Sequence, residues 1–189
     1  MAHSNNSVIT GKFKGSLGKE LVFRDWEGKT IVAKSPKARS GEPHPKQVIT
    51  QEKFLLASRY AKAITKAQDK SMAEAYALAV KPRQNTYSRA LEDFLTSPDV
   101  KSIGTRAYKG IVGDTIVIRA VDDFRVLGVH VEIHSANGTL LESGNAVMNA
   151  NGLDWTYTAT QANNLLTGTK IKAIATDVPN NEGTLEITL

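Results

Sequence analysis

Residues 129–139 have the sequence VHVEIHSANGT, and this stretch decides the fold of the C-terminal half of the chain. Its apolar residues Val129, Val131 and Ile133 alternate with polar ones, which is the period of two expected of a half-buried β-strand. The Asn-Gly pair that follows favours a tight turn, because both residues tolerate positive φ. The stretch therefore predicts a strand that enters a β-hairpin.

Short alternating runs of the same kind fill the chain from Thr115 to Leu189. Trp155 and Tyr157 are separated by one polar residue, which places both rings on the same face of a strand. Turn residues separate the runs at intervals of roughly 8–12 residues, a spacing typical of a β-sandwich. We therefore expect about six or seven strands here and place Trp155 in the sandwich core.

A hairpin is predicted near the N-terminus. Leu21–Phe23 and Thr30–Ala33 are two apolar runs, and the segment Asp25–Lys29 between them favours a turn. Because a two-stranded ribbon is only marginally stable in water, this hairpin needs a partner surface. The helices that follow, the sandwich or another subunit are each able to supply that surface.

Three helices are predicted over residues 50–68, 71–80 and 86–95, from apolar residues at i, i+3 and i+4 spacing. Thr50 is the expected N-cap of the first helix, and Ser71 opens the second with the spacing of a capping box. Many of the apolar positions are alanine, so the helices bury little apolar area. We therefore expect them to dock on another surface, in the first place that of a second copy of the chain.

These patterns predict an α+β protein in two parts. A basic module of an N-terminal β-hairpin plus short helices occupies residues 1–98, a linker occupies residues 99–113, and an immunoglobulin-like β-sandwich occupies residues 114–189. At 189 residues the chain is long enough for one or two small domains with cores of their own.

Charge is distributed unevenly between the two halves. Residues 1–90 contain 17 Lys and Arg against 7 Asp and Glu, a net charge of +10, whereas residues 91–189 contain 7 against 12, a net charge of −5. Three interpretations are open: the basic half binds nucleic acid or another polyanion, it meets the acidic half of a second copy, or the charges form a solvated surface.

Residues 35–46 (SPKARSGEPHPK) contain three prolines and several basic side chains, which favours an extended segment. The segment is interpreted either as a surface connector or as a cationic arm that reaches a neighbouring subunit or a nucleic-acid backbone. Trp26 at the hairpin tip either packs on its own chain or anchors in another subunit, since tryptophan is enriched at binding hot spots. The predicted assembly interface consists of Phe23, Trp26, Lys34, Lys37, Arg39 and Lys46.

The chain contains no cysteine, which excludes disulfides, thiolate metal sites and a cysteine nucleophile. Residues 1–7 lack the basic start and apolar core of a secretory signal, so we expect synthesis in the cytoplasm without a classical signal peptide and assign no final location. No apolar run approaches the roughly 20 residues needed to span a bilayer, and no membrane insertion is expected.

Two groups of side chains invite a metal interpretation. His130 and His134 share one strand face, but at about 3.3 Å per residue they stand roughly 13 Å apart, too far to bind one zinc ion. Asp122 and Asp123 are either ordinary turn carboxylates or, with Asp177 nearby, a calcium site at the edge between the two parts. No EF-hand spacing supports that calcium site, and we predict no metal ligand set.

No catalytic residues are predicted. The chain has no GxSxG elbow, its Gly-Lys pairs at residues 11–12 and 18–19 lack the spacing of a phosphate loop, and no cluster of nucleophile, base and oxyanion donors stands out. We therefore expect a protein that is not an enzyme and that uses no cofactor.

Two resemblances add to this interpretation. Over roughly residues 9–95 the chain resembles a family of uncharacterised bacterial proteins, on the motifs Gly11-Lys12-Phe13, Gly15–Lys19, Trp26–Lys29, Ser35-Pro36-Lys37 and Gln51–Phe54. That family implies no activity. The segments 155–160 and 174–181 resemble the closing strands of bacterial immunoglobulin-like modules, in which an Ala-x-Asp-x-x-x-Asn stretch commonly forms the last hairpin. This second resemblance implies a spacer, decoration or binding unit on a surface or virion-like assembly.

The leading functional hypothesis is a non-catalytic structural subunit of a homomeric or virion-like assembly. In it the basic module makes the scaffold contacts by self-association, and the sandwich projects or binds. The alternatives are a nucleic-acid-associated basic protein and a surface module whose sandwich binds a carbohydrate or a protein.

Overall fold

The computed structural model describes residues 2–4, 14–26, 29–37 and 41–189. Their contacts divide the chain into two compact units, Met1–His44 and Pro45–Leu189. The predicted boundary near residue 98 differs from this division. The helices belong to the same unit as the sandwich rather than to the hairpin.

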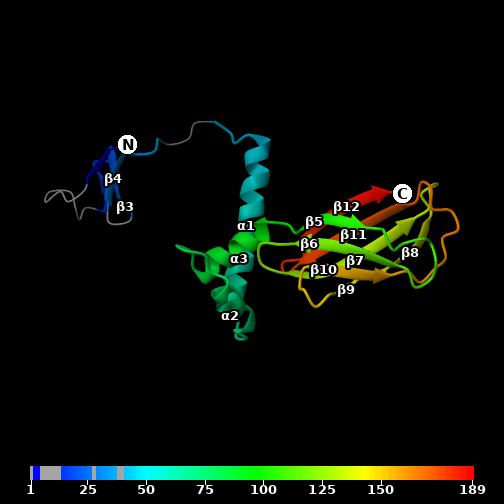
Figure 1. Ribbon diagram of the computed structural model, residues 1–189. Helices are drawn as coiled ribbons and strands as arrows, with labels where there is room; N and C mark the ends of the chain where they lie inside the picture. The colour runs from blue at the N-terminus through cyan, green and yellow to red at the C-terminus, as the bar shows by residue number, and fades with distance from the viewer. Residues whose placement is uncertain (1, 5–13, 27–28, 38–40) are drawn as a thin grey trace. The chain divides into compact units, whose positions relative to one another are not determined.

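The first unit is one antiparallel sheet with the strand order β1-β4-β3-β2, drawn in blue in Figure 1. Its strands are β1 (Ala2–Ser4), β2 (Gly15–Leu17), β3 (Leu21–Trp26) and β4 (Lys29–Lys34). The predicted hairpin is formed by β3 and β4, in which Phe23 pairs with Val32 and Trp26 with Lys29. The two outer strands were not predicted, because three residues are too few to show an alternating pattern.

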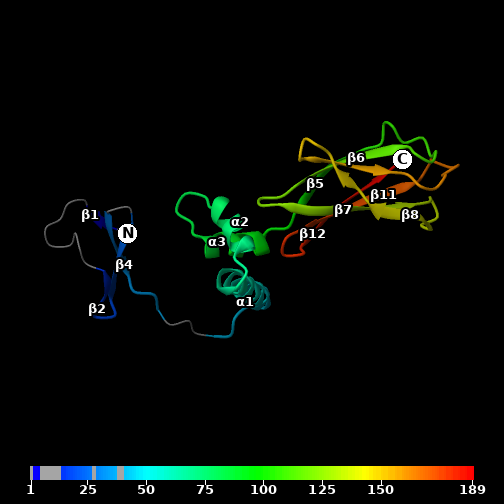
Figure 2. The ribbon, with the colours of Figure 1, turned by 90° about the horizontal axis from the view of Figure 1, so that it is seen from below.

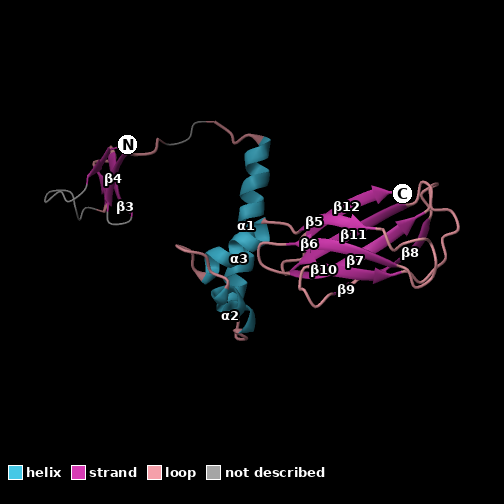
Figure 3. Ribbon diagram, viewed as in Figure 1, coloured by secondary structure: helices cyan, strands magenta, loops and turns pink. Residues whose placement is uncertain are grey.

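The second unit contains a β-sandwich of two antiparallel sheets, shown with the helices in Figure 3. One sheet has the strand order β5-β6-β10-β9, and the other has the order β12-β11-β7-β8. The strands are β5 (Asp99–Gly104), β6 (Thr115–Val121), β7 (Val126–His134), β8 (Leu140–Asn145), β9 (Val147–Met148), β10 (Asp154–Thr158), β11 (Lys170–Asp177) and β12 (Glu182–Thr188). The mixed α+β class and the sandwich-like β content therefore agree with the prediction.

The core of the sandwich is built by the alternation that the sequence displays. Ile116 and Ile118 of β6, Ile133 of β7 and Ile171 of β11 are completely buried, so both sheets contribute to one core. Trp155 of β10 is 6% exposed and belongs to the same cluster, which confirms its predicted place. At about 25 cal/mol per Å² of buried apolar area, this core is the main stabilising element of the unit.

The strand β5 occupies part of the segment that we predicted to be a linker. It pairs with β6, and Val100 is buried in the sandwich core. The register shifts between Val100 and Ser102, so an extra residue interrupts the period of two on this strand. That interruption hides the strand in the sequence, and residues 99–104 are a strand rather than a linker.

The three predicted helices are present as α1 (Pro45–Lys66), α2 (Ser71–Leu78) and α3 (Thr86–Leu95). The bounds of α3 match the prediction, but α1 begins earlier than expected. Proline suits the first position of a helix, and the Thr50 hydroxyl donates to the Lys46 carbonyl at 2.9 Å from inside the helix instead of capping it. None of the helices in the described part of the chain has the length and apolar character of a membrane span.

The caps of the two shorter helices also differ from the prediction. Ser71 makes no capping box, and its backbone N–H instead donates to the Asp69 carboxylate at 2.9 Å. Asn85 caps α3, where its side-chain oxygen accepts from the Ser88 N–H at 2.8 Å. In both helices, a side-chain oxygen one or two residues before the first helical residue accepts a hydrogen bond from an N–H group of the first turn. This is the usual way to satisfy the first N–H groups of a helix.

The helices have only a small core of their own. Its buried residues are Ala61, Tyr76 and Ala90, and two residues from sandwich loops, Phe124 and Val178, pack against them. The ring of Phe124 stacks on that of Tyr76 with centroids 4.3 Å apart. The expected docking of these alanine-rich helices therefore takes place on the sandwich of the same chain, at the end shown beside α2 and α3 in Figure 2.

The chain passes from α3 into the sandwich through a close backbone contact. A Cβ atom at Gly183 of β12 would stand 1.8 Å from the carbonyl oxygen of Pro98, which is well inside the contact distance. Only glycine permits this approach, since every other residue carries a Cβ.

Candidate functional site

The structure brings together only part of the predicted assembly interface. Phe23, Trp26 and Lys34 lie in the sheet of the first unit, where Phe23 is half-buried and Lys34 is exposed. Lys37 is an exposed residue that follows this sheet. Arg39 and the side chain of Trp26 lie outside the described residues.

Lys46 is the one predicted interface residue that belongs to the second unit, where it lies exposed in the first turn of α1. The role of all six residues in assembly stays a prediction.

The second unit presents an apolar helix face that the sequence did not assign to the interface. Every residue of α1 from Pro45 to Leu56 is exposed, and in Figure 1 these turns extend past α2 and α3. The large apolar side chains on this stretch include Val48, Ile49, Leu55 and Leu56, which are 36, 65, 51 and 52% exposed. A soluble helix normally turns such residues toward a core, so a contiguous exposed set marks an interaction surface.

Two charged residues flank the leucines on the same side of α1. Glu52, Leu55, Leu56 and Arg59 have the spacing i, i+3, i+4 and i+7, which places them along one stripe of a helix. Within the residues that the structure describes, neither Glu52 nor Arg59 has an ion-pair partner. We call Val48, Ile49, Glu52, Leu55, Leu56 and Arg59 the α1 face.

A second group of polar side chains lies where the helices meet the sandwich. The hydroxyls of Tyr60 in α1 and Tyr76 in α2 are 2.8 Å apart, and Tyr76 donates to Oδ2 of Asp93 in α3. Burial raises the pKa of Tyr76 far above its usual value, so its hydroxyl keeps its proton and remains a donor. One chain of hydrogen bonds thus joins the three helices and ends on a fully buried carboxylate.

Arg89 of α3 fastens the helices to the loop between β6 and β7. Its guanidinium is 1% exposed, and Nη1 donates to Oδ2 of Asp123 at 2.9 Å while Nη2 donates to the carbonyl and carboxylate of the same residue. Glu92 and Lys81 extend this network, with the Lys81 Nζ lying 2.9 Å from the Glu92 carboxylate. A forked contact of this kind fixes both distance and orientation between helix and loop.

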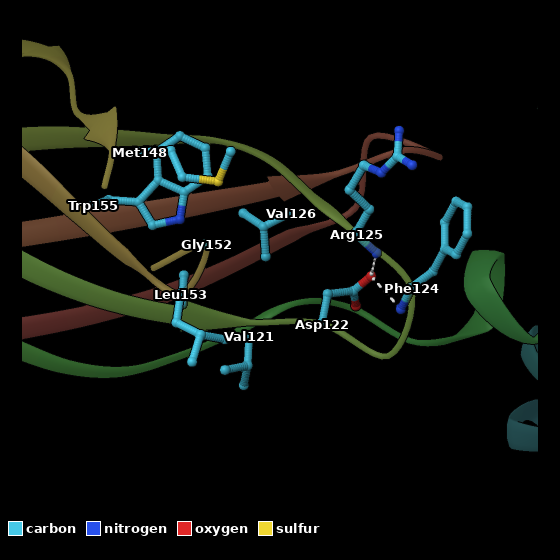
Figure 4. Close-up of a pocket in the computed structure, with 10 residues that line it drawn as sticks. Val121, Asp122, Phe124, Arg125, Val126, Met148, Gly152, Leu153 and Trp155 are labelled. Carbon is cyan, nitrogen blue, oxygen red and sulfur yellow. Dashed lines mark hydrogen bonds between the residues drawn. The ribbon is translucent and has the colours of Figure 1, made fainter. Parts of the chain in front are cut away.

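Asp122 opens the same loop and shapes its turn. Its Oδ2 accepts from the N–H groups of Phe124 at 3.1 Å and Arg125 at 2.9 Å, as the dashed lines in Figure 4 mark. Its other oxygen, Oδ1, is buried and has no hydrogen-bond partner among the described residues. Asp122 is therefore a turn carboxylate with one oxygen left over.

Asp93 has an unpaired oxygen as well, again considering the described part of the chain. One carboxylate oxygen from each of Asp93, Asp122 and Asp123 lies within 4.8 Å of the other two. Burial raises the pKa of Asp93 to about 7, and the negative charges of Asp122, Asp177 and Asp123 add to this effect, whereas the hydrogen bond from Tyr76 opposes it. Burial and the repulsion between neighbouring carboxylates therefore both destabilise the negative charge of this cluster.

The closing hairpin of the sandwich forms the other contact with α3. Asp177 is completely buried at the end of β11, and its carboxylate accepts from the backbone and side-chain N–H groups of Asn181 at 2.6 and 2.7 Å. The Asn181 amide also donates to the carbonyls of Phe94 and Thr96, both at 3.2 Å. The Ala-x-Asp-x-x-x-Asn stretch thus forms the last hairpin and caps the C-terminal end of the helix.

Sequence analysis singled out two of the three carboxylates of this cluster. Asp122 and Asp123 lie in a turn, which was one of their two predicted interpretations. Asp93 was missed, although Arg89 and Asp93 are charged residues four apart on a short amphipathic helix, a signal that favours a polar contact beside the core. His130 and His134 bond separately, to Asn145 at 2.8 Å and, more weakly, to Glu132 at 3.4 Å.

A pocket of about 410 Å³ opens near the same end of the sandwich. Figure 4 shows Trp155, Met148 and Leu153 on one side of it and Asp122 at the other, while Phe124 points away toward the helices. Because Trp155 is only 6% exposed, its ring does not provide a flat platform for a sugar. The lining suits an apolar side chain or a small apolar group.

Comparisons with known proteins identify no family for this chain. No family model matches it, and no curated protein matches it. A solved tetra-tandem repeat in the extending region of a large adhesion protein is 19% identical, with a TM-score of 0.36, over 49% of this chain and 23% of that chain. A solved engineered protein is 19% identical, with a TM-score of 0.34, over 53% of this chain and 22% of that chain. Such TM-scores support no functional conclusion. The match spans less than a quarter of the length of each of the two solved proteins.

Proposed function

We propose that this protein is a non-catalytic structural subunit that associates with copies of itself through the α1 face, leaving the sandwich to project or to bind. The observation that carries the proposal is the exposure of Val48, Ile49, Leu55 and Leu56 on one helix. The first turns of α1 continue a helix that is packed further along, but they leave these apolar side chains in water, so a covering surface stabilises them.

The pattern of the α1 face favours a second copy as that covering surface. Glu52 and Arg59 each lie three positions from the Leu55-Leu56 pair, on opposite sides. If two α1 helices cross antiparallel about a two-fold axis at this pair, Leu55 of each copy meets Leu56 of the other. Glu52 of each copy then faces Arg59 of the other, so one surface complements itself in shape and in charge.

The size of this face indicates a weak association. Burying a leucine, isoleucine or valine side chain completely contributes about 1.5–3 kcal/mol, and four such side chains per copy are half-exposed at the start. Association costs roughly 4–15 kcal/mol in lost translational and rotational freedom. The expected product is therefore a dimer whose population depends on protein concentration.

The strand order supports an immunoglobulin-like module as the projecting part. In such sandwiches one sheet has strands A, B, E and D and the other has G, F and C, with an additional strand beside C in some members. Lettering β5, β6, β7, β8, β9, β10, β11 and β12 as A, B, C, C′, D, E, F and G reproduces both observed orders. The lack of cysteine means that this sandwich has no inter-sheet disulfide.

Light scattering and sedimentation of the full chain over a range of concentrations test the proposal. We expect a concentration-dependent dimer that the double substitution Leu55→Ser/Leu56→Ser abolishes. Leu78→Ser is the matched control, because Leu78 is 91% exposed on α2 and lies outside the α1 face. A wild-type chain that remains monomeric at high concentration and low salt would overturn the proposal.

Charge reversal tests the antiparallel geometry separately. Glu52→Arg alone and Arg59→Glu alone place like charges opposite each other twice per dimer, so each is expected to weaken dimerisation several-fold. The double variant Glu52→Arg/Arg59→Glu restores opposite charges and is expected to recover wild-type affinity, within the modest energies of exposed ion pairs. Equal loss in all three variants would contradict this pairing.

A further inference from the structure

Two buried carboxylate oxygens at the helix–sandwich junction have no hydrogen-bond partner within the described residues. Asp93 is 0% exposed and comes from α3, whereas Asp122 comes from the β6–β7 loop. Oδ1 of each residue is buried and lacks a hydrogen-bond partner within the described residues. Buried acceptors are nearly always satisfied in folded proteins, and for charged ones the cost of isolation is high, so a missing occupant is indicated.

The charge around these oxygens is strongly negative. The carboxylates gathered here are Glu92, Asp93, Asp122, Asp123 and Asp177, and the cations that pair with them are Lys81 and Arg89. Both cations bind to Glu92 and Asp123, and in the described part of the chain neither forms an ion pair with Asp93 or Asp122. The excess charge therefore lies at the two residues whose oxygens are unpaired.

The spacing of the oxygens fits one metal ion. Asp93, Asp122 and Asp123 each offer an oxygen within 4.8 Å of the other two. Ca²⁺ binds oxygen at about 2.3–2.6 Å, so two of its ligands stand up to about 5 Å apart, whereas Mg²⁺, at about 2.0–2.1 Å, allows only about 4.2 Å. We propose that these three carboxylates bind a divalent cation, with Ca²⁺ preferred and water completing its coordination shell.

The site is compatible with every hydrogen bond already in place. Asp93 keeps the bond from Tyr76 on Oδ2, and Asp122 keeps the turn on Oδ2, so Oδ1 of each residue remains open to an ion. Asp123 retains Arg89, because each carboxylate oxygen has two lone pairs. A bound ion thus connects a helix with a sandwich loop and adds no competition for existing donors.

Calcium titration of the full chain by calorimetry, after removal of metal with EDTA, tests the site. We expect one saturable CaCl₂ site per chain at pH 7.5, a weaker response to MgCl₂, and a higher Tm in CaCl₂ than in EDTA. Asp93→Asn and Asp122→Asn are each expected to weaken Ca²⁺ binding at least about tenfold, because both remove a charged ligand. Asp99→Asn, at an exposed carboxylate in β5 that pairs with Lys101, is the control expected to bind as the wild type does.

Tb³⁺ luminescence gives a second measurement that needs no substitution in the buried cluster. Tyr76, which donates to Asp93, is expected to sensitise Tb³⁺ bound at this site, and CaCl₂ is expected to displace the signal. The site shares no residue with the α1 face. The Leu55→Ser/Leu56→Ser variant should therefore bind Ca²⁺ normally, whatever its state of association.

Three outcomes overturn the site. In the first, millimolar CaCl₂ causes no heat, no Tm shift and no loss of Tb³⁺ signal. In the second, Ca²⁺ binding persists unchanged in both the Asp93 and the Asp122 variants, which means that the ion lies elsewhere. In the third, Tm in EDTA rises as the pH falls below about 7 and Ca²⁺ has no effect, which means that a proton on Asp93 fills the space instead.

Discussion

The core of the sandwich and the core of the helices are built in opposite ways. The sandwich draws its buried residues from both of its own sheets, including Ile116, Ile133 and Ile171, and within the described residues its core cluster contains no helix residue. The core cluster of the helices contains two buried alanines and Tyr76, and Phe124 and Val178 from sandwich loops pack against it. The amphipathic pattern of a short, alanine-rich helix determines which face becomes buried. The apolar area buried by its alanines is too small to stabilise the docked helix without further contacts.

Their carboxylates differ in the same sense. In the sandwich, hydrogen bonds from the backbone N–H groups of Ile111 and Lys109 hold the pKa of Asp114 below its usual value. At the junction, burial raises the pKa of Asp93 and of Asp177. Asp114 is therefore stabilised in its charged form by the hydrogen bonds that it accepts. The carboxylates at the junction are destabilised in their charged form, which favours the binding of a cation or a proton.

The largest expected effect comes from Ile118→Ala, which attacks the self-sufficient core. Ile118 is completely buried, so its truncation leaves a cavity and is expected to cost about 3–4 kcal/mol in the free energy of unfolding. Urea denaturation followed by circular dichroism measures this loss. Because the helices depend on the sandwich, strands and helices are expected to unfold together. A loss below about 1 kcal/mol would contradict the assignment of one tight core.

A smaller and more local effect is expected from Phe124→Ala, which removes the ring that the helices borrow. The substitution deletes the stack on Tyr76 and is expected to cost about 2 kcal/mol, less than a fully buried phenylalanine, since Phe124 is only half-buried. Hydrogen exchange should accelerate in α2 and α3 while β6 and β11 remain protected.

Leu127→Ala is the control for that experiment, because Leu127 lies three residues further along and is 54% exposed. Equal acceleration of exchange in strands and helices of the Phe124 variant would show that the two cores are one cooperative unit. That result would remove the contrast drawn above.

The smallest expected effect concerns Asp114→Asn and pH. A carboxylate whose folded pKa lies below its ordinary value of 3.8 stabilises the fold above that pH and loses this contribution as the pH falls through the folded pKa. The variant is therefore expected to have a lower urea midpoint than the wild type at pH 7 and nearly the same midpoint in strong acid. A difference that is the same at both pH values would point to lost packing rather than to charge.

The sandwich was predictable because burial on one face leaves a period of two in the sequence. Val129, Val131 and Ile133 display it without interruption, whereas the extra residue between Val100 and Ser102 conceals β5. The start of α1 was missed for a different reason. Pro45 closes a proline-rich segment that favours extended chain, yet proline is equally suited to the first position of a helix, and local sequence does not distinguish the two.

The site was less predictable than the fold because it is made by contacts between distant segments. Asp122 and Asp123 stand out in the sequence as a turn pair, but Asp93 precedes them by 29 residues and meets them only after α3 docks. The α1 face was hidden in a similar way. Its leucines lie within the predicted first helix but were not singled out, and only the packed structure shows which turns of α1 remain uncovered.

The contact between Gly183 and the Pro98 carbonyl has a consequence for how this fold diverges. A strand residue that is not fully buried is usually free to change, yet a Cβ at position 183 would collide with the backbone carbonyl of Pro98. Distant descendants of this sequence are therefore expected to retain glycine there after most other similarity has vanished, so that one small residue serves as a marker of common ancestry.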